Sequence, residues 1–368
     1  MKYRILFILH FPPPVHGSSV VGQYIKSSDR INNAFICDFV NLSTSQSMEE
    51  IGKINFRKVF TFITILCTII KKFLTQRYDL CYIAITVTRS ALYKDSVVVG
   101  LAKLFKQKIV YHLHNKGVKT RQDNIFNHFL YKRIFKNISV ILLSKHLYPD
   151  IQKYVPEDKV YYCPDGVPEA ANSQKIIKNE NDPVEILFLS NMTESKGIYI
   201  LLDACKMLKD KGYKFTCNFV GPWNSVTEHS FNNYVTKNRL NGHVIYKGKK
   251  YGKDKEQYFR RADIFAFPTF NDCFGLVLLE AMQFSLPVVS TYEGGIPDIV
   301  EDGVTGFLCP QKDVTALAGK LEMLIKDRFL RVQMGAAGNR KYKKEFTLEN
   351  LENNLKSILI SIIEAKSG

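Results

Sequence analysis

Several features that define specialised protein classes are missing from this sequence of 368 residues. Its eight cysteines are scattered, without a Cys-x2-Cys pair or a cysteine–histidine cluster. This pattern argues against a structural zinc site and a disulfide framework, and it suits a reducing cytosol. No stretch reaches the roughly 18 uncharged apolar residues of a transmembrane helix. The apolar run at the N-terminus is short, and Pro12-Pro13-Pro14 follow it without a small-residue cleavage site, so we expect no signal peptide.

Acidic residues are scarce in one part of the chain, so the net charge of +16 is uneven. Residues 1–168 carry 24 lysines and arginines against 11 acids, whereas residues 169–368 carry 27 against 24. Within residues 51–150 the ratio is 18 to 4, a surplus of 14 positive charges. We expect an anionic partner for this half, either a membrane surface or nucleic acid, unless the charge only reflects a basic proteome.

The clearest local pattern lies in residues 262–287, ADIFAFPTFNDCFGLVLLEAMQFSLP. Residues 264–267 predict a buried strand, a polar loop follows, and a helix begins at residues 274–275. The N–H groups at a helix start lack intrahelical partners and lie at the positive end of the dipole, so a phosphate fits there. Asp272 precedes this helix and Glu280 lies about two turns inside it. On the pattern alone, an ordinary βα unit with Asp272 as a helix cap and Glu280 as a surface acid is an equal alternative.

This stretch resembles the Glu-x7-Glu signature of retaining glycosyltransferases of family GT4, which have the GT-B fold. Glu280 matches the second acid, whereas Asp272 stands where the family usually has the first glutamate. The resemblance implies that Glu280 holds the ribose hydroxyls and that Asp272 contacts the donor sugar. It also implies that the backbone of Phe274, Gly275 and Leu276 binds the diphosphate. The likeness continues through most of the C-terminal half, in the runs Pro287–Thr291, Glu293–Asp298 and Asp302–Leu308.

The loop after a predicted strand at residues 185–190 adds two candidates for donor binding. In the family this loop supplies a lysine and an arginine to the diphosphate, and Lys196 matches the lysine. Asn191 stands where the arginine is usual. An asparagine can donate a hydrogen bond but lacks the charge and the bidentate fork of arginine. A solvated loop charge is the alternative for Lys196.

In the N-terminal half the resemblance is looser and rests on single positions. Gly17 follows the first predicted strand and matches a glycine that lies near the diphosphate. His112 and His114 share one strand face by the period of two, and His114 matches a histidine that contacts the donor sugar. A buried structural histidine is the alternative for His114, and we expect no metal there because no carboxylate lies nearby in the sequence. Residues 164–166 resemble the family's Pro-Asn-Gly element, with Asp165 in place of asparagine.

A basic segment at residues 57–72, RKVFTFITILCTIIKK, has Thr61, Thr64 and Thr68 at spacings of three and four. This spacing predicts a helix with one polar face. The helix either packs on the sheet of the N-terminal domain or lies at a membrane interface. In the second case its flanking cations would meet anionic lipid; they are Arg57, Lys58, Lys71 and Lys72.

Together these patterns predict an α/β protein with the GT-B fold, two Rossmann-like domains with a cleft between them. The N-terminal, acceptor-side domain is expected over residues 1–167. Residues 168–183 are polar and patternless and are predicted to link the domains. The nucleotide-sugar-binding domain is expected over residues 184–348. Residues 349–368 are predicted to form a helix that packs back on the N-terminal domain.

The resemblance implies transfer of a sugar from a nucleotide sugar, expected to be a UDP-sugar, with retention of configuration. The acceptor would be a glycan or a polyprenyl-linked glycan of capsule or lipopolysaccharide synthesis in a bacterium. Asp272, His114 and Glu280 are the candidate catalytic residues. No metal or other cofactor and no nucleic acid partner are expected, and the predicted location is the cytoplasmic face of the plasma membrane. Two alternatives stay open: a catalytically weak nucleotide-sugar-binding subunit, and a nucleotide-sugar epimerase of the same fold.

Overall fold

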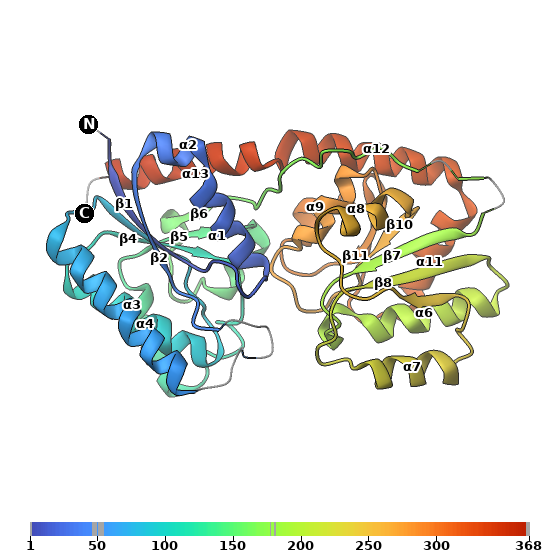
Figure 1. The fold of residues 1–368 in the computed structure, drawn as a ribbon, viewed down its shortest axis with the longest axis horizontal. Coiled ribbons are helices and arrows are strands. Elements are labelled where there is room, and N and C mark those ends of the chain that lie inside the picture. Colours follow the sequence, from blue (N-terminus) through green and yellow to red (C-terminus); the bar gives the residue numbers. More distant parts are fainter. Residues whose placement is uncertain (1, 46–49, 51–54, 177, 180–181, 366–368) are drawn as a thin grey trace. The chain divides into compact units, whose positions relative to one another are not determined.

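The computed structural model describes residues 2–45, 50, 55–176, 178–179 and 182–365. The chain forms two compact units, each built around its own sheet (Figure 1). Unit 1 comprises Met1–Asp165 and Leu348–Gly368, and unit 2 comprises Gly166–Thr347. No helix within the described ranges is long and apolar enough to cross a bilayer.

Unit 1 contains a six-stranded parallel sheet in the order β2-β1-β3-β4-β5-β6. The strand order reverses between β1 and β3, which makes the sheet doubly wound, a topology that binds ligands beyond the carboxyl ends of its strands. The central strands are continuous apolar runs, as expected where helices cover both faces. The strands are β1 Arg4–Leu9, β2 Ile36–Asn41, β3 Leu80–Ile83, β4 Ile109–Leu113, β5 Ser139–Leu142 and β6 Val160–Tyr162.

Helices cover both faces of this sheet. Figure 1 shows α1, α2 and α13 on one face and α3 and α4 on the other. Although α13 comes last in the sequence, it belongs to unit 1: Arg30 pairs with Glu349 at 2.7 Å, and Leu355 and Leu359 are fully buried. The helices are α1 Gly17–Ser27, α2 Asp29–Ala34, α3 Phe56–Thr75, α4 Arg89–Leu104, α5 Ile125–Phe135 and α13 Leu348–Glu364, with short 3-10 turns at η2 Lys145–Asp150 and η3 Glu157–Lys159.

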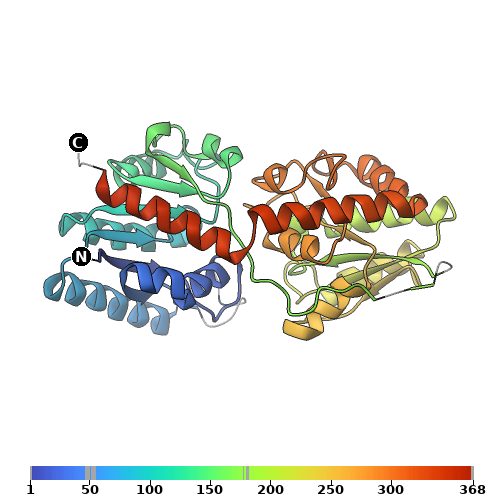
Figure 2. The ribbon, with the colours of Figure 1, turned by 90° about the horizontal axis from the view of Figure 1, so that it is seen from above.

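Unit 2 repeats this plan with a parallel sheet in the order β12-β11-β10-β7-β8-β9. Its strands are β7 Val184–Leu189, β8 Phe215–Val220, β9 Val244–Tyr246, β10 Ile264–Ala266, β11 Val288–Thr291 and β12 Gly306–Cys309. Its helices are η4 Glu194–Lys196, α6 Ile198–Asp210, α7 Glu228–Lys237, α8 Gly252–Arg261, α9 Leu276–Gln283, α10 Ile296–Ile299, α11 Val314–Lys326 and α12 Arg328–Glu345. Figure 2 shows α12 running along this unit and ending where α13 begins. The predicted fold class, an α/β protein with two Rossmann-like domains, is confirmed.

One local expectation differs from the structure. Residues 168–183, expected to link the domains, lie within unit 2, where the Ala170 N–H donates to Gln283 at 2.8 Å and the Lys175 ammonium donates to the Ala262 carbonyl at 2.6 Å. These contacts use backbone groups and long polar side chains, so the search for an apolar pattern in residues 168–183 did not reveal them.

The helix predicted over residues 57–72 is confirmed as α3, and the expected threonine face is exposed at Thr64 and Thr68. The hydroxyls of Thr61, Thr64 and Thr68 donate to backbone carbonyls four residues earlier, at 2.8, 3.1 and 2.8 Å. The exposed side of the helix also carries large apolar side chains, including Phe60 and Ile63, which are 73% and 51% exposed. The threonine hydroxyls are therefore bonded within the helix, and the exposed side of α3 is partly apolar.

Candidate functional site

The candidate donor site of unit 2 is built on two neighbouring strands. Lys196 ends η4 in the loop after β7, and Asp272 lies in the loop after β10. The strands β7 and β10 are adjacent at the point where the strand order reverses, which is the ligand-binding edge of a doubly wound sheet. The Lys196 ammonium lies 2.7 Å from the Asp272 Oδ2 and donates to the Asn271 carbonyl at 3.2 Å. The structure thus joins two predicted site residues that are 76 positions apart.

Gly197 allows these two loops to approach each other. Its φ of +83° lies in the left-handed region, and a Cβ placed there would come within 2.0 Å of the Pro268 carbonyl oxygen. Both the backbone conformation and the lack of space therefore require glycine at this position. The close approach holds Lys196 over the loop that carries Asp272.

The Asp272 loop is fixed from a second side by a glutamate that the sequence analysis did not single out. The Asp272 N–H donates to Glu293 at 2.8 Å, and the Cys273 N–H donates to the Asp272 side chain at 2.8 Å. Glu293 is only 4% exposed and also accepts from Gln311. It lies two residues after β11, and such positions line the ligand edge of the sheet.

The helix α9 presents its N-terminus beside this loop. Gly275 is its N-cap, with a φ of +92°, and no side chain caps the helix, so the alternative in which Asp272 is the cap is wrong. Phe274 is 2% exposed and packs on Phe346 with ring centroids 6.1 Å apart, so its contribution to a site is limited to its backbone. Leu276 is the first residue of the helix. These N–H groups form the kind of helix end that attracts anions.

Glu280 lies inside α9 and is paired with a residue that the sequence analysis missed. Lys255 of α8 approaches its Oε1 at 2.7 Å, and both side chains are about three-quarters buried. Each of the two candidate acids therefore has its own lysine. Asn191 lies two residues after β7, at the same edge of the sheet as Lys196. Trp223 follows β8, and its ring stacks on that of Tyr246, the last residue of β9, with centroids 3.8 Å apart.

A second group of candidate residues lies in unit 1, at the carboxyl ends of β1, β4 and β6. Gly17 is the first residue of α1, and His16 caps this helix by accepting from the Ser19 N–H. His114 follows β4, and its Nδ1 lies 3.5 Å from the Asp165 Oδ2. The ligand atoms of His112, His114 and Asp165 all lie within 4.8 Å of one another. No carboxylate lies near the two histidines in the sequence, but the fold brings Asp165 to them from two strands away.

Most imidazoles of this group are held neutral. Burial and repulsion from neighbouring charges lower the pKa of His10 to about 3. Burial, followed by the influence of His114, lowers the pKa of His16 and lowers the pKa of His112 well below its usual value. The ring of His112 is also engaged by the Tyr82 hydroxyl at Nδ1, whereas its Nε2 has no hydrogen-bond partner among the described residues. His112 and His114 were expected on one strand face, whereas His10 and His16 come from the segment after β1, and their place beside the pair was not predicted.

The fold is shared with solved structures of other proteins. The crystal structure of Anabaena HepE in complex with UDP and glucose is similar over 98% of this chain and 100% of that chain, with a TM-score of 0.73 and 18% identity. This likeness places the chain in the GT-B fold of glycosyltransferases.

Sequence comparisons agree with the fold. The model of the family described as glycosyl transferases group 1 matches residues 169–341. The putative colanic acid biosynthesis glycosyltransferase WcaL of Escherichia coli is 28% identical over 70% of this chain and 65% of its own length. The capsular polysaccharide biosynthesis glycosyltransferase CapM of Staphylococcus aureus is 27% identical over 53% of this chain and 50% of its own length. The chain thus spans about two-thirds or less of these relatives. The matches support the glycosyltransferase class expected from the sequence.

Proposed function

We propose that the protein transfers a sugar from a UDP-sugar to a glycan or polyprenyl-linked glycan, with retention of configuration, in bacterial surface polysaccharide synthesis. The observation that carries this proposal is the Lys196–Asp272 pair beside the uncapped start of α9. It lies inside the region that matches the group 1 family, residues 169–341. The relatives named for colanic acid and capsular polysaccharide synthesis support the choice of acceptor class.

The chemistry requires positive charge where a nucleoside diphosphate departs. Lys196 and the backbone N–H groups of Phe274, Gly275 and Leu276 supply it and lower the barrier to breaking the glycosidic bond. Asn191 donates one further, uncharged hydrogen bond. The departing phosphate accepts the proton of the acceptor hydroxyl, so neither Asp272 nor Glu280 acts as the base.

The remaining candidates position the donor. Glu280 holds the ribose hydroxyls, Asp272 holds hydroxyls of the donor sugar, and Lys255 keeps the Glu280 carboxylate in place. From unit 1, His114 contacts the sugar and Gly17 lies near the diphosphate.

Incubation of the purified protein with a panel of UDP-, GDP- and dTDP-sugars tests the proposal. Release of UDP that depends on a glycan acceptor, with an α-linked product from an α-linked donor, is the expected result. Tight UDP-sugar binding without turnover would support the binding-subunit alternative. Conversion of the donor into its epimer without an acceptor would support the epimerase alternative.

Activity should survive EDTA, because Lys196 and the start of α9 already provide the positive charge for the diphosphate. Initial rates measured with and without excess EDTA should agree within about twofold. For scale, a tenfold change corresponds to about 1.4 kcal/mol of free energy. A complete loss of activity that Mg²⁺ or Mn²⁺ restores would contradict this cation-free account.

We also propose that unit 1 attaches to an anionic membrane surface, but not through the cations expected at the ends of α3. Arg57 pairs with Glu50 and Lys72 pairs with Asp38, both at 2.6 Å. Lys58 is buried and reaches the Glu50 carbonyl. Lys71 is exposed. Three of the four flanking cations are therefore engaged within the protein, and the electrostatic role of this segment is smaller than its sequence implies.

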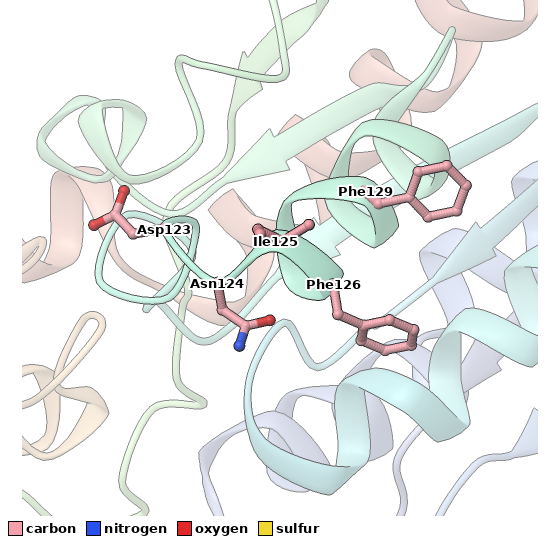
Figure 3. A pocket seen from close by; sticks show the side chains of 5 residues that line it. All are labelled: Asp123, Asn124, Ile125, Phe126 and Phe129. Atoms are coloured by element: carbon pink, nitrogen blue, oxygen red, sulfur yellow. The ribbon is translucent and has the colours of Figure 1, made fainter.

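The start of α5 offers a better membrane contact. Ile125, Phe126 and Phe129 are 88%, 61% and 60% exposed, and Figure 3 shows Phe126 and Phe129 projecting from the first turns of the helix. The exposed Lys132 and Arg133 follow on the same helix. Burial, and to a smaller extent the charges of Arg133 and Lys136, lower the pKa of Lys103 to about 8. Aromatic side chains beside cations suit the interface of an anionic leaflet.

The triple change Ile125→Ser, Phe126→Ser, Phe129→Ser should reduce binding to phosphatidylglycerol vesicles in a sedimentation assay by at least about tenfold. Burying one such apolar side chain in the membrane contributes roughly 1.5–3 kcal/mol to binding, and a serine loses most of this contribution. The matched control is Phe329→Ser with Val332→Ser on α12 of unit 2, which are 76% and 63% exposed. Binding by the wild type should also fall as salt screens the cations. Equal sedimentation of the triple variant and the wild type would remove α5 from the membrane surface.

A further inference from the structure

His114 and Asp165 form a nearly buried pair of polar side chains, and each side chain has an atom without a hydrogen-bond partner among the described residues. Their side chains are 5% and 4% exposed, and Nδ1 of His114 lies 3.5 Å from Oδ2 of Asp165. Within the described part of the chain, neither His114 Nδ1 nor Asp165 Oδ1 has a hydrogen-bond partner. Buried polar atoms without partners are costly, so a pair of this kind indicates a function or a ligand-bound state in which the contact closes.

His114 is the imidazole that lies against Asp165. The His112 ring lies against the His114 ring, with centroids 4.2 Å apart, and its Nδ1 is engaged by the Tyr82 hydroxyl. The His112 Nε2, like the His114 Nδ1, has no hydrogen-bond partner among the described residues. His16 uses its Nδ1 to accept from the Ser19 N–H.

We propose that Asp165 is a positioning residue that holds His114 in the tautomer with its proton on Nδ1. A carboxylate accepts hydrogen bonds and does not donate them, so the nitrogen that faces it must carry the proton. A neutral imidazole has one N–H, and its Nε2 is then left as an acceptor. Such an acceptor can take a hydrogen bond from a sugar hydroxyl but cannot donate one. This last step rests on the proposed function, whereas the tautomer does not.

The identity of residue 165 matters for this role. An asparagine at this position can turn either its carbonyl oxygen or its amide nitrogen toward His114, and the two orientations select opposite tautomers. An aspartate, which only accepts, selects a single tautomer of His114. The separation of 3.5 Å is longer than a good hydrogen bond, and contacts of this kind often tighten only when substrate binds.

Nitrogen NMR of the protein labelled with ¹⁵N-histidine reads the tautomer directly, without any need for catalytic activity. The His114 signals are assigned by their loss in His114→Gln. We expect the Nδ1–H form in the wild type and a shift toward the Nε2–H form in Asp165→Leu. Asp165→Asn, which keeps the shape and an acceptor oxygen, should give a mixture of the two forms and provides a second variant if the leucine variant folds poorly. An Nε2–H form in the wild type, or a tautomer that neither variant changes, would overturn the proposal.

A double-mutant cycle on transfer rates tests whether Asp165 acts through His114. Asp165→Leu should lower kcat by at least about tenfold in the wild type and by less than about twofold in the His114→Gln background, because residues that act as a unit are not additive. If the two substitutions lowered kcat independently, so that their effects multiplied in the double variant, the proposal would be overturned. If the protein showed no transferase activity, the NMR result would still decide the tautomer, so the two proposals fail separately. Binding of Zn²⁺ with a Kd below about 1 µM, lost in both Asp165→Leu and His112→Gln, would instead assign these side chains to a cation.

Discussion

Replacing Lys196 by alanine should weaken the binding of UDP by at least about tenfold. A hydrogen bond to a charged group contributes about 1.5–3 kcal/mol, and each 1.4 kcal/mol corresponds to a factor of ten in Kd. The Lys196 ammonium is held by the Asp272 carboxylate and the Asn271 carbonyl, at the edge where β7 and β10 end. Because Asn191 lacks the charge that arginine would supply, we expect Lys196 to carry more of the diphosphate attraction than one contact usually does.

Titration calorimetry with UDP measures this effect, and Lys326→Ala is the matched control. Lys326 also pairs with a carboxylate, Glu322, at 2.6 Å, but it ends α11, away from the loops that carry the candidate site. Loss of an exposed ion pair of this kind changes little in a protein. The control should therefore bind UDP as the wild type does. An unchanged Kd in Lys196→Ala would remove Lys196 from the diphosphate site.

Changes at the two acids should separate their roles. Asp272→Ala should lower kcat by about tenfold or more, because hydrogen bonds to the donor sugar are lost where the bond breaks. The same change should leave UDP binding intact or strengthen it, because it releases Lys196 from an ion pair that competes with the phosphate. Glu280→Gln should instead raise the KM for the donor and also reduce the rate, because the ribose loses an ionised acceptor.

Initial rates over a range of donor concentrations, together with UDP calorimetry, distinguish these outcomes. Asp272→Glu restores the acid at the length that the family usually has and shows whether the shorter side chain is a local adaptation. Full turnover in Asp272→Ala would contradict the sugar contact. An unchanged KM in Glu280→Gln would contradict the ribose contact.

The sequence predicted the elements of this structure better than the contacts between them. The apolar run at residues 264–267 and the helix after it appear as β10 and α9, because burial and helix-start signals are local properties of the chain. The Lys196–Asp272 and His114–Asp165 contacts depend on which strands lie side by side. A charge or a histidine after a strand indicates the edge of the sheet, but it does not indicate its partner.

At α3 the helix was predicted but its contacts were not. The threonine stripe does have helical spacing, but the sequence does not show that each hydroxyl bonds to its own helix backbone. Nor does the count of lysines and arginines show that Arg57 and Lys72 are neutralised by Glu50 and Asp38. Formal charge was therefore a poor measure of the charge available to a partner.

The assignment of α13 to unit 1 bears on how the chain acquires its structure during translation. Unit 2 is one continuous segment, Gly166–Thr347, and can fold as soon as it leaves the ribosome. Unit 1 combines Met1–Asp165 with a helix that is synthesised after all of unit 2. Until then, the surface of unit 1 that buries Leu351, Leu355, Leu359 and Ile362 is uncovered. The earlier-synthesised half is thus completed last, and a nascent chain that stalls before residue 348 exposes an apolar surface that chaperones recognise.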